Sequence, residues 1–143
     1  MPPLAVAGIS IKVDYSLIFR QTKLEKFSAC DKMCRHVGLL RLFPSISLEN
    51  VRSFLQPPTK GAVIQTYGTG NMPSNRKDII EALAEATARG VIIANNTQCL
   101  HGILEILYET GEALVQANVI PGLDMTPEAA LIKLSYVIGK DWD

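Results

Sequence analysis

The most constraining feature of the sequence is an alternation between short apolar runs and helical patterns. Apolar runs of strand length occupy residues 37–43, 61–67 and 91–94, and amphipathic patterns with helical spacing follow the first two. A strand, a helix and a second strand in this order form a βαβ unit with parallel strands. We therefore expect an α/β fold, a three-layer α/β/α sandwich with a small, mostly parallel sheet.

Local helix signals agree with this order of elements. Ser47 precedes an apolar helical face and has the short hydroxyl side chain that caps a helix N-terminus. Thr126 followed by Pro127 is typical of the start of a helix, because proline at the first position loses no helical hydrogen bond. Glu85 and Arg89 have the i,i+4 spacing of an ion pair on a solvated helix face.

The N-terminal part of the chain has a different pattern. Residues 5–13 alternate weakly and predict one short strand, and residues 20–35 are rich in charged side chains. We expect residues 1–35 to form an interdomain linker or a peripheral arm. The α/β domain is then expected over residues 36–143.

Charge and hydropathy argue against several classes of protein, although a local basic patch stays possible. Lys+Arg and Asp+Glu both number 14, so the formal net charge is zero, whereas binding to nucleic acid or to an anionic membrane needs a basic excess. No run reaches the ~18 apolar residues of a membrane span, and the start lacks a basic segment before its apolar run. We therefore predict a soluble, cytoplasmic protein without nucleic-acid or membrane partners.

The three cysteines do not form a metal-binding pattern. Cys30 and Cys34, with His36 close by, lack a second pair of ligands, and Cys99 stands alone. An odd number of cysteines without a CxxC pair favours free thiols in a reducing compartment. We expect no metal ion here.

Polar residues follow two of the predicted strands. The segments 66–75 and 95–102 combine glycine with uncharged threonine, asparagine and glutamine side chains, and ligands bind at the carboxyl ends of parallel strands. Such groups suit an amide or a zwitterionic amino acid better than a polyphosphate. Gly68 and Gly70 lack the third glycine of a dinucleotide site and the lysine of a P-loop, so no cofactor is expected. From spacing alone, a plain turn explains the first segment equally well.

A thiol-based active site is a further alternative. Cys99 and His101 lie two residues apart, and side chains at this spacing share one face of an extended chain. A cysteine nucleophile also needs a group that orients its base, and no acid is fixed near this pair in the sequence. A structural or exposed cysteine is therefore the preferred interpretation.

Three segments together resemble a known family. They are Tyr67-Gly-Thr-Gly-Asn71, Asn95-Asn-Thr-Gln-Cys99 and Gly122-Leu-Asp-Met-Thr-Pro-Glu-Ala129. In this order they resemble the C-terminal domain of cytosolic, bacterial-type-I-like L-asparaginases, over about residues 37–140. The start, Pro2-Pro-Leu-Ala-Val-Ala-Gly-Ile9, is similar to the segment that joins the two domains in that family.

The resemblance implies an amidohydrolase parent that converts L-asparagine to L-aspartate and ammonia. The catalytic threonines of the family lie in an N-terminal domain, and this chain has no Thr-Gly-Gly-Thr-like or His-Gly-Thr-Asp-like segment. Without an activated nucleophile and oxyanion donors, amide hydrolysis lacks the groups that lower its barrier. We therefore expect a non-catalytic domain, inactive alone, whose partners are the N-terminal catalytic domain, L-asparagine and further copies of itself in a homo-oligomer.

Individual residues match functional positions of the family. Asn71 matches the position that reaches the active site of a neighbouring subunit. Gln65, Thr97 and Cys99 match an allosteric asparagine site, although bacterial members have arginine where Gln65 stands. A neutral amide does not supply the charge-assisted pair that arginine forms with a carboxylate. The alternative to an asparaginase domain is a stand-alone module that binds a small amino acid.

Overall fold

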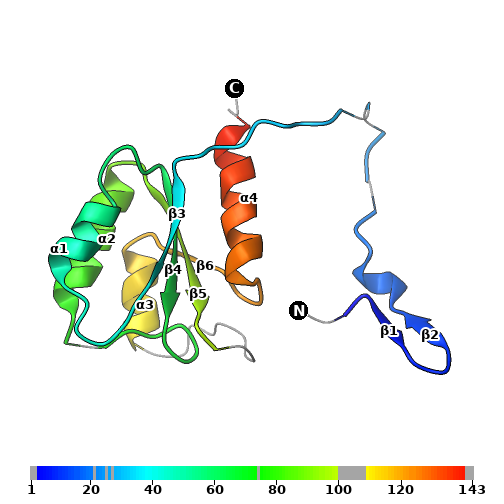
Figure 1. Cartoon of the computed structure of the whole chain (residues 1–143), viewed down its shortest axis with the longest axis horizontal. Coiled ribbons are helices and arrows are strands. Elements are labelled where there is room, and N and C mark those ends of the chain that lie inside the picture. The colour runs from blue at the N-terminus through cyan, green and yellow to red at the C-terminus, as the bar shows by residue number, and fades with distance from the viewer. Residues whose placement is uncertain are drawn as a thin grey trace. The chain divides into compact units, whose positions relative to one another are not determined.

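The computed structural model divides the chain into two compact units, Met1–Asp31 and Lys32–Asp143. The described residues are 3–20, 22–24, 26, 28–73, 75–99 and 109–140. Figure 1 shows the elements of both units.

The first unit contains a small antiparallel hairpin. Strand β1 (Ala5–Ala7) pairs with β2 (Ile11–Val13), so the stretch expected to be one strand is two strands joined by a turn. The turn lies where Gly8 donates its backbone N–H to the Ser10 carbonyl at 3.2 Å. Each strand has only three residues and every one is exposed, so this unit has little apolar core of its own.

A four-stranded sheet lies at the centre of the second unit. Its strands are β3 (Val37–Arg41), β4 (Gly61–Thr66), β5 (Ile92–Thr97) and β6 (Ile120–Pro121). They pair in the order β3-β4-β5-β6, and each pair is parallel. The α/β fold class with a small parallel sheet is therefore confirmed.

Helices cover both faces of this sheet (Figure 1). Helices α1 (Leu48–Phe54), α2 (Lys77–Ala88) and α3 (Glu109–Gln116) lie on one face, and α4 (Pro127–Gly139) lies on the other. This arrangement is the predicted three-layer sandwich. Because α4 runs antiparallel to the strands, its N-terminus lies at their carboxyl ends.

Each face of the sheet has its own apolar core. On the larger side, Ile64 and Ile93 pack with buried residues of α1, α2 and α3, among them Leu83. On the other side, fully buried Val63 packs against Ala130 and Leu134 of α4. Alternate residues of β4 therefore enter opposite cores, as expected for a strand covered on both faces.

The helix caps form as the sequence predicts. Ser47 Oγ accepts a hydrogen bond of 3.1 Å from Asn50 N–H, and Thr126 Oγ1 accepts one of 3.2 Å from Ala129 N–H. Each bond satisfies a backbone donor that has no partner within the first turn of its helix.

Two local predictions were wrong. The polar residues at 95–97 were expected in a loop but belong to β5, since they pair with residues 64–66 of β4. Glu85 pairs with Arg52 of α1 at 2.9 Å rather than with Arg89, whose guanidinium donates to the Leu55 carbonyl at 3.2 Å. An ion pair between α1 and α2 is thus found in place of the Glu85–Arg89 pair expected within α2.

The start of the second unit is fixed to α4. Cys34 N–H donates to the Ser135 carbonyl at 2.9 Å, and Ser135 Oγ donates to the Cys34 carbonyl at 2.6 Å. Gly139 permits this approach, because a Cβ there would lie 2.7 Å from Cys34 N. The backbone before β3 therefore packs directly on the last helix.

The described residues contain neither a membrane-spanning helix nor a cluster of metal ligands. None of the helices in these ranges is long and apolar enough to span a lipid bilayer. Nor do the same ranges bring three His, Cys, Asp or Glu side chains together in a group that could hold a metal ion.

Candidate functional site

The two polar segments meet at the carboxyl ends of β4 and β5. Gln65 pairs with Asn96 in register, and Thr66 pairs with Thr97. The chain leaves β4 through residues 67–71 and leaves β5 at Gln98, whose N–H donates to the Thr66 carbonyl at 2.9 Å. These neighbouring strand ends form the candidate site.

Residues 67–71 form a tight turn. Tyr67 and Asn71 exchange two backbone hydrogen bonds, each of 2.8 Å. Gly68 and Gly70 have φ values of +50° and +106°, which glycine adopts without steric strain. The turn therefore has a defined shape, and its glycines are required by the backbone.

A buried polar pair fixes this turn to β5. Thr66 Oγ1 donates to Asn95 Oδ1 at 2.7 Å, and Asn95 Nδ2 donates to the Gly70 carbonyl at 3.1 Å. The side chains are 0% and 4% exposed. Since buried polar groups are costly unless they are hydrogen-bonded, this connection holds the two strand ends together.

Thr97 joins the two segments on the other side of the turn. Its hydroxyl donates to the Gly68 carbonyl and accepts a hydrogen bond of 3.0 Å from Cys99 N–H. The exposed residue Cys99 is therefore positioned through its backbone.

Gln98 connects three strand ends. Its Nε2 donates to the carbonyls of Leu42 at 2.6 Å and Gln65 at 2.9 Å. Its Oε1 accepts a hydrogen bond of 3.1 Å from Arg41 Nε. The end of β5 is thereby linked to β4 and to β3.

Asn96 connects the sheet to the turn before α4. Its Nδ2 donates to the Met125 carbonyl at 2.7 Å, and the side chain is almost completely buried. Its Oδ1 has no hydrogen-bond partner within the described part of the chain. Gly122 lies against this amide, and a Cβ at that position would be 2.6 Å from Oδ1.

The structure brings together only some of the predicted site residues. Thr97 and Cys99 are hydrogen-bonded to each other. Asn71 lies in the turn that Thr97 contacts through the Gly68 carbonyl, and its Nδ2 donates to Thr69 Oγ1 at 3.2 Å. Gln65 lies in register with Asn96 and two residues after Val63, whose side chain packs against α4. Because side chains two residues apart on a strand share one face, the side chain of Gln65 lies on the α4 side of the sheet. His101, from the thiol alternative, lies outside the described residues.

A hollow adjoins the turn on the side of α2. It has a volume of about 380 Å³, and its lining includes Phe43, Tyr67, Met72 and Arg76. Arg76 donates to both carboxylate oxygens of Asp78 at 2.9 Å, and its Nη1 donates to the Ile46 carbonyl at 2.8 Å. The hydrogen bond from Arg76 holds the pKa of Asp78 below its ordinary value.

The contacts of two residues at this edge of the sheet were not predicted from the sequence. Arg41 lies within the apolar run 37–43, where a single charged residue does not show which groups its side chain contacts. Gly122 follows a two-residue strand, and its contact with Asn96 joins positions 26 apart in the chain. The available signals were a charged residue within an apolar run and, for Gly122, its place at the start of the third segment that resembles the family.

The chain matches a known family model over residues 36–143, described as the glutaminase/asparaginase C-terminal domain. It is 54% identical to an L-asparaginase of Dirofilaria immitis over 144 aligned residues, which cover 100% of this chain and 24% of that protein. It is 45% identical to the human 60 kDa lysophospholipase over 138 residues, covering 96% of this chain and 24% of that protein. The chain therefore spans about a quarter of the length of these curated relatives.

A solved structure shares the same architecture. L-asparaginase I from Vibrio cholerae superposes with a TM-score of 0.84 at 36% identity, covering 100% of this chain and 42% of that chain.

Proposed function

Because the chain belongs to the glutaminase/asparaginase C-terminal domain family, we propose that it is the non-catalytic C-terminal domain of an L-asparaginase. The parent protein adds water to the side-chain amide of L-asparagine and releases L-aspartate and ammonia. The observation that carries the proposal is the match of the whole chain to about a quarter of an L-asparaginase at 54% identity. The other three quarters would include the catalytic N-terminal domain.

In this proposal, residues 1–35 connect the α/β domain at 36–143 to the N-terminal domain of a cytoplasmic homo-oligomer. Asn71 contacts the substrate in a neighbouring subunit through its side-chain amide. The defined turn supports this role, because two backbone hydrogen bonds fix the position of Asn71. A substrate-orienting group must be held in place before the substrate arrives.

The same proposal assigns a ligand site to Gln65, Thr97 and Cys99. The ligand is L-asparagine, and its binding regulates the parent enzyme. Uncharged donors and acceptors at the strand ends support a zwitterionic ligand of this kind. Thr97 contributes by shaping the site, since its hydroxyl is already bonded to Gly68 and Cys99.

Ammonia release from L-asparagine tests the main proposal. The 143-residue chain is assayed alone and after mixing with a separately produced N-terminal domain. We expect no activity from the chain alone and activity from the mixture. Activity of the chain alone, or a folded mixture without activity, would contradict the proposal.

Two variants in the mixture test the role of Asn71. Asn71→Ala is expected to lower kcat/KM at least about tenfold, since loss of a hydrogen bond to the substrate costs on the order of 1.5 kcal/mol. Asn50→Ala, at an exposed position of α1, is the control and should not change it. Equal kcat/KM values for the two variants would contradict a contact between Asn71 and the substrate.

A stand-alone module that binds a small amino acid is the second candidate. The observation that favours it is that the hydrogen bonds from the side chains of Thr66, Thr97 and Gln98, to Asn95, Gly68 and Gln65 respectively, all lie within the second unit. Saturable binding of asparagine or aspartate in a calorimetric titration, without activity on mixing, would support this candidate over the first.

A further inference from the structure

Arg41 lies beside the proposed ligand residue Gln65. It is the last residue of β3 and pairs in register with Gln65 on β4. In a parallel sheet, residues in register point to the same face, and neighbouring strands are about 4.8 Å apart. Both side chains therefore lie on the α4 side of the sheet, close enough for one small molecule to contact both.

Gln98 fixes the guanidinium in this position. Its Oε1 accepts from Arg41 Nε, while its Nε2 donates to the backbone carbonyl of Gln65. One side chain thus holds the arginine relative to the strand on which Gln65 lies. The bond uses the Nε of the guanidinium and leaves the donors on its two terminal nitrogens for another acceptor.

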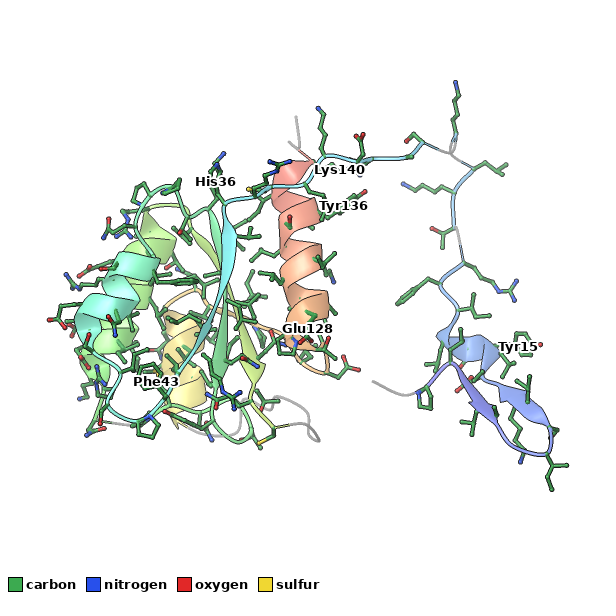
Figure 2. The ribbon with its side chains drawn as sticks, viewed as in Figure 1. Tyr15, His36, Phe43, Glu128, Tyr136 and Lys140 are labelled. Carbon is green, nitrogen blue, oxygen red and sulfur yellow. The ribbon has the colours of Figure 1, made fainter. Side chains whose placement is uncertain are left out.

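The charge of Arg41 is not neutralised by a carboxylate within the described part of the chain. Within the described ranges, the ion pairs join Arg52 to Glu85 and Arg76 to Asp78, and no carboxylate pairs with Arg41. Figure 2 shows Glu128, in the first turn of α4, at the same end of the domain as Phe43, which follows β3. The positive pole of the α4 dipole is therefore at this end and also favours an anion.

We propose that Arg41 binds the carboxylate of a small amino acid at this site, with the amide of Gln65 beside it. The inference rests on the proposed ligand site and names its charge-recognising residue. A guanidinium presents paired donors that match the two oxygens of a carboxylate. The neutral side chain of Gln65 then contacts the uncharged amide of the ligand.

Calorimetric titration of the 143-residue chain tests this inference. The probes are L-asparagine and 3-aminopropanamide, which is asparagine without its carboxylate. Wild type is expected to bind L-asparagine at least tenfold more tightly. Arg41→Gln is expected to weaken L-asparagine binding 10- to 100-fold and to leave binding of 3-aminopropanamide unchanged.

Two further variants distinguish loss of the Arg41 charge at the site from a general loss of charge or structure. Arg52→Gln removes an exposed arginine on the opposite side of the sheet and should leave both affinities unchanged. Arg41→Gln combined with Gln65→Arg moves the cation to the neighbouring strand and should restore part of the lost affinity. Circular dichroism should show the same fold for every variant, since Arg41 and Arg52 are exposed.

The outcomes distinguish the inference from the function on which it rests. Wild-type affinity in Arg41→Gln overturns the role of Arg41 and leaves the ligand site standing. If the wild type shows no saturable binding of L-asparagine, both the ligand site and the role of Arg41 are contradicted. The ammonia assay then still tests whether the parent protein is an L-asparaginase.

Discussion

The hydroxyl of Thr66 donates a 2.7 Å hydrogen bond to the side-chain carbonyl of Asn95, and both residues are buried. Asn95 in turn donates to Gly70, so this pair connects the end of β4, the end of β5 and the turn between β4 and α2. The geometry of the candidate site therefore depends on a buried pair of polar side chains.

Thr66→Val is expected to lower the free energy of unfolding by about 1–3 kcal/mol, because it leaves the buried Asn95 Oδ1 without its donor. Urea unfolding of the single variants and of Thr66→Val with Asn95→Ala measures the coupling between them. We expect the double variant to lose less than the sum of the single losses. Strictly additive losses would show that the bond contributes nothing to stability.

Gly122→Ala is expected to destabilise the protein by roughly 1–3 kcal/mol through overpacking. A Cβ at this position would lie 2.6 Å from the Asn95 carbonyl and 2.6 Å from Asn96 Oδ1. Gly8→Ala is the control, since the nearest atom to a Cβ there is 3.7 Å away. A thermal midpoint for Gly122→Ala equal to that of the control would contradict the close packing.

The ion pair of Arg76 and Asp78 predicts a pH-dependent stability. The hydrogen bond from Arg76 lowers the folded-state pKa of Asp78 from its ordinary value of 3.8. Stability from this pair is therefore fully present above about pH 4 to 5 and is lost as the pH falls through the lower folded-state pKa. Asp78→Asn should be less stable than wild type at pH 7, and the difference should shrink below pH 4.

The control for that measurement is Glu81→Gln, which removes an exposed carboxylate from the same helix. Urea unfolding at pH 7 and at pH 3 compares the two variants. A constant difference between Asp78→Asn and wild type across this range would show that the pair does not contribute to stability.

Ser135→Ala is expected to cost about 1 kcal/mol of stability, because the Cys34 carbonyl loses its 2.6 Å hydrogen bond from Ser135. Ser53→Ala, an exposed serine on α1, is the matched control. Proteolysis should cut residues 32–36 faster in Ser135→Ala than in wild type. Equal cleavage rates would mean that this contact does not hold the segment on α4.

Much of the fold could be predicted from the sequence, since apolar runs and helix caps are local signals. The βαβ order gave the parallel sheet, and Ser47 and Thr126 cap the helices that their positions indicate. The end of β5 could not be predicted in this way. Asparagine is rare in strands, and the side chains of Asn95 and Asn96 are accommodated here by hydrogen bonds with Thr66, Gly70 and Met125.

The candidate site was harder to predict for a similar reason. Arg41 and Gln65 are 24 positions apart, and only the register of β3 on β4 makes them neighbours. Glu85 has a sequence neighbour, Arg89, at ideal helical spacing, yet it pairs with Arg52 on another helix. Contacts between elements depend on how those elements pack, and periodicity within one element does not contain that information.

The strand order has a consequence for how the domain can assemble during synthesis. Because β3, β4, β5 and β6 are neighbours in the sheet in the order in which a ribosome makes them, each new strand joins an edge that already exists. No strand has to insert between two that are already paired. The face of the sheet around Val63 differs, because α4, which covers it, is synthesised after all four strands. That face therefore stays open to water until α4 has emerged.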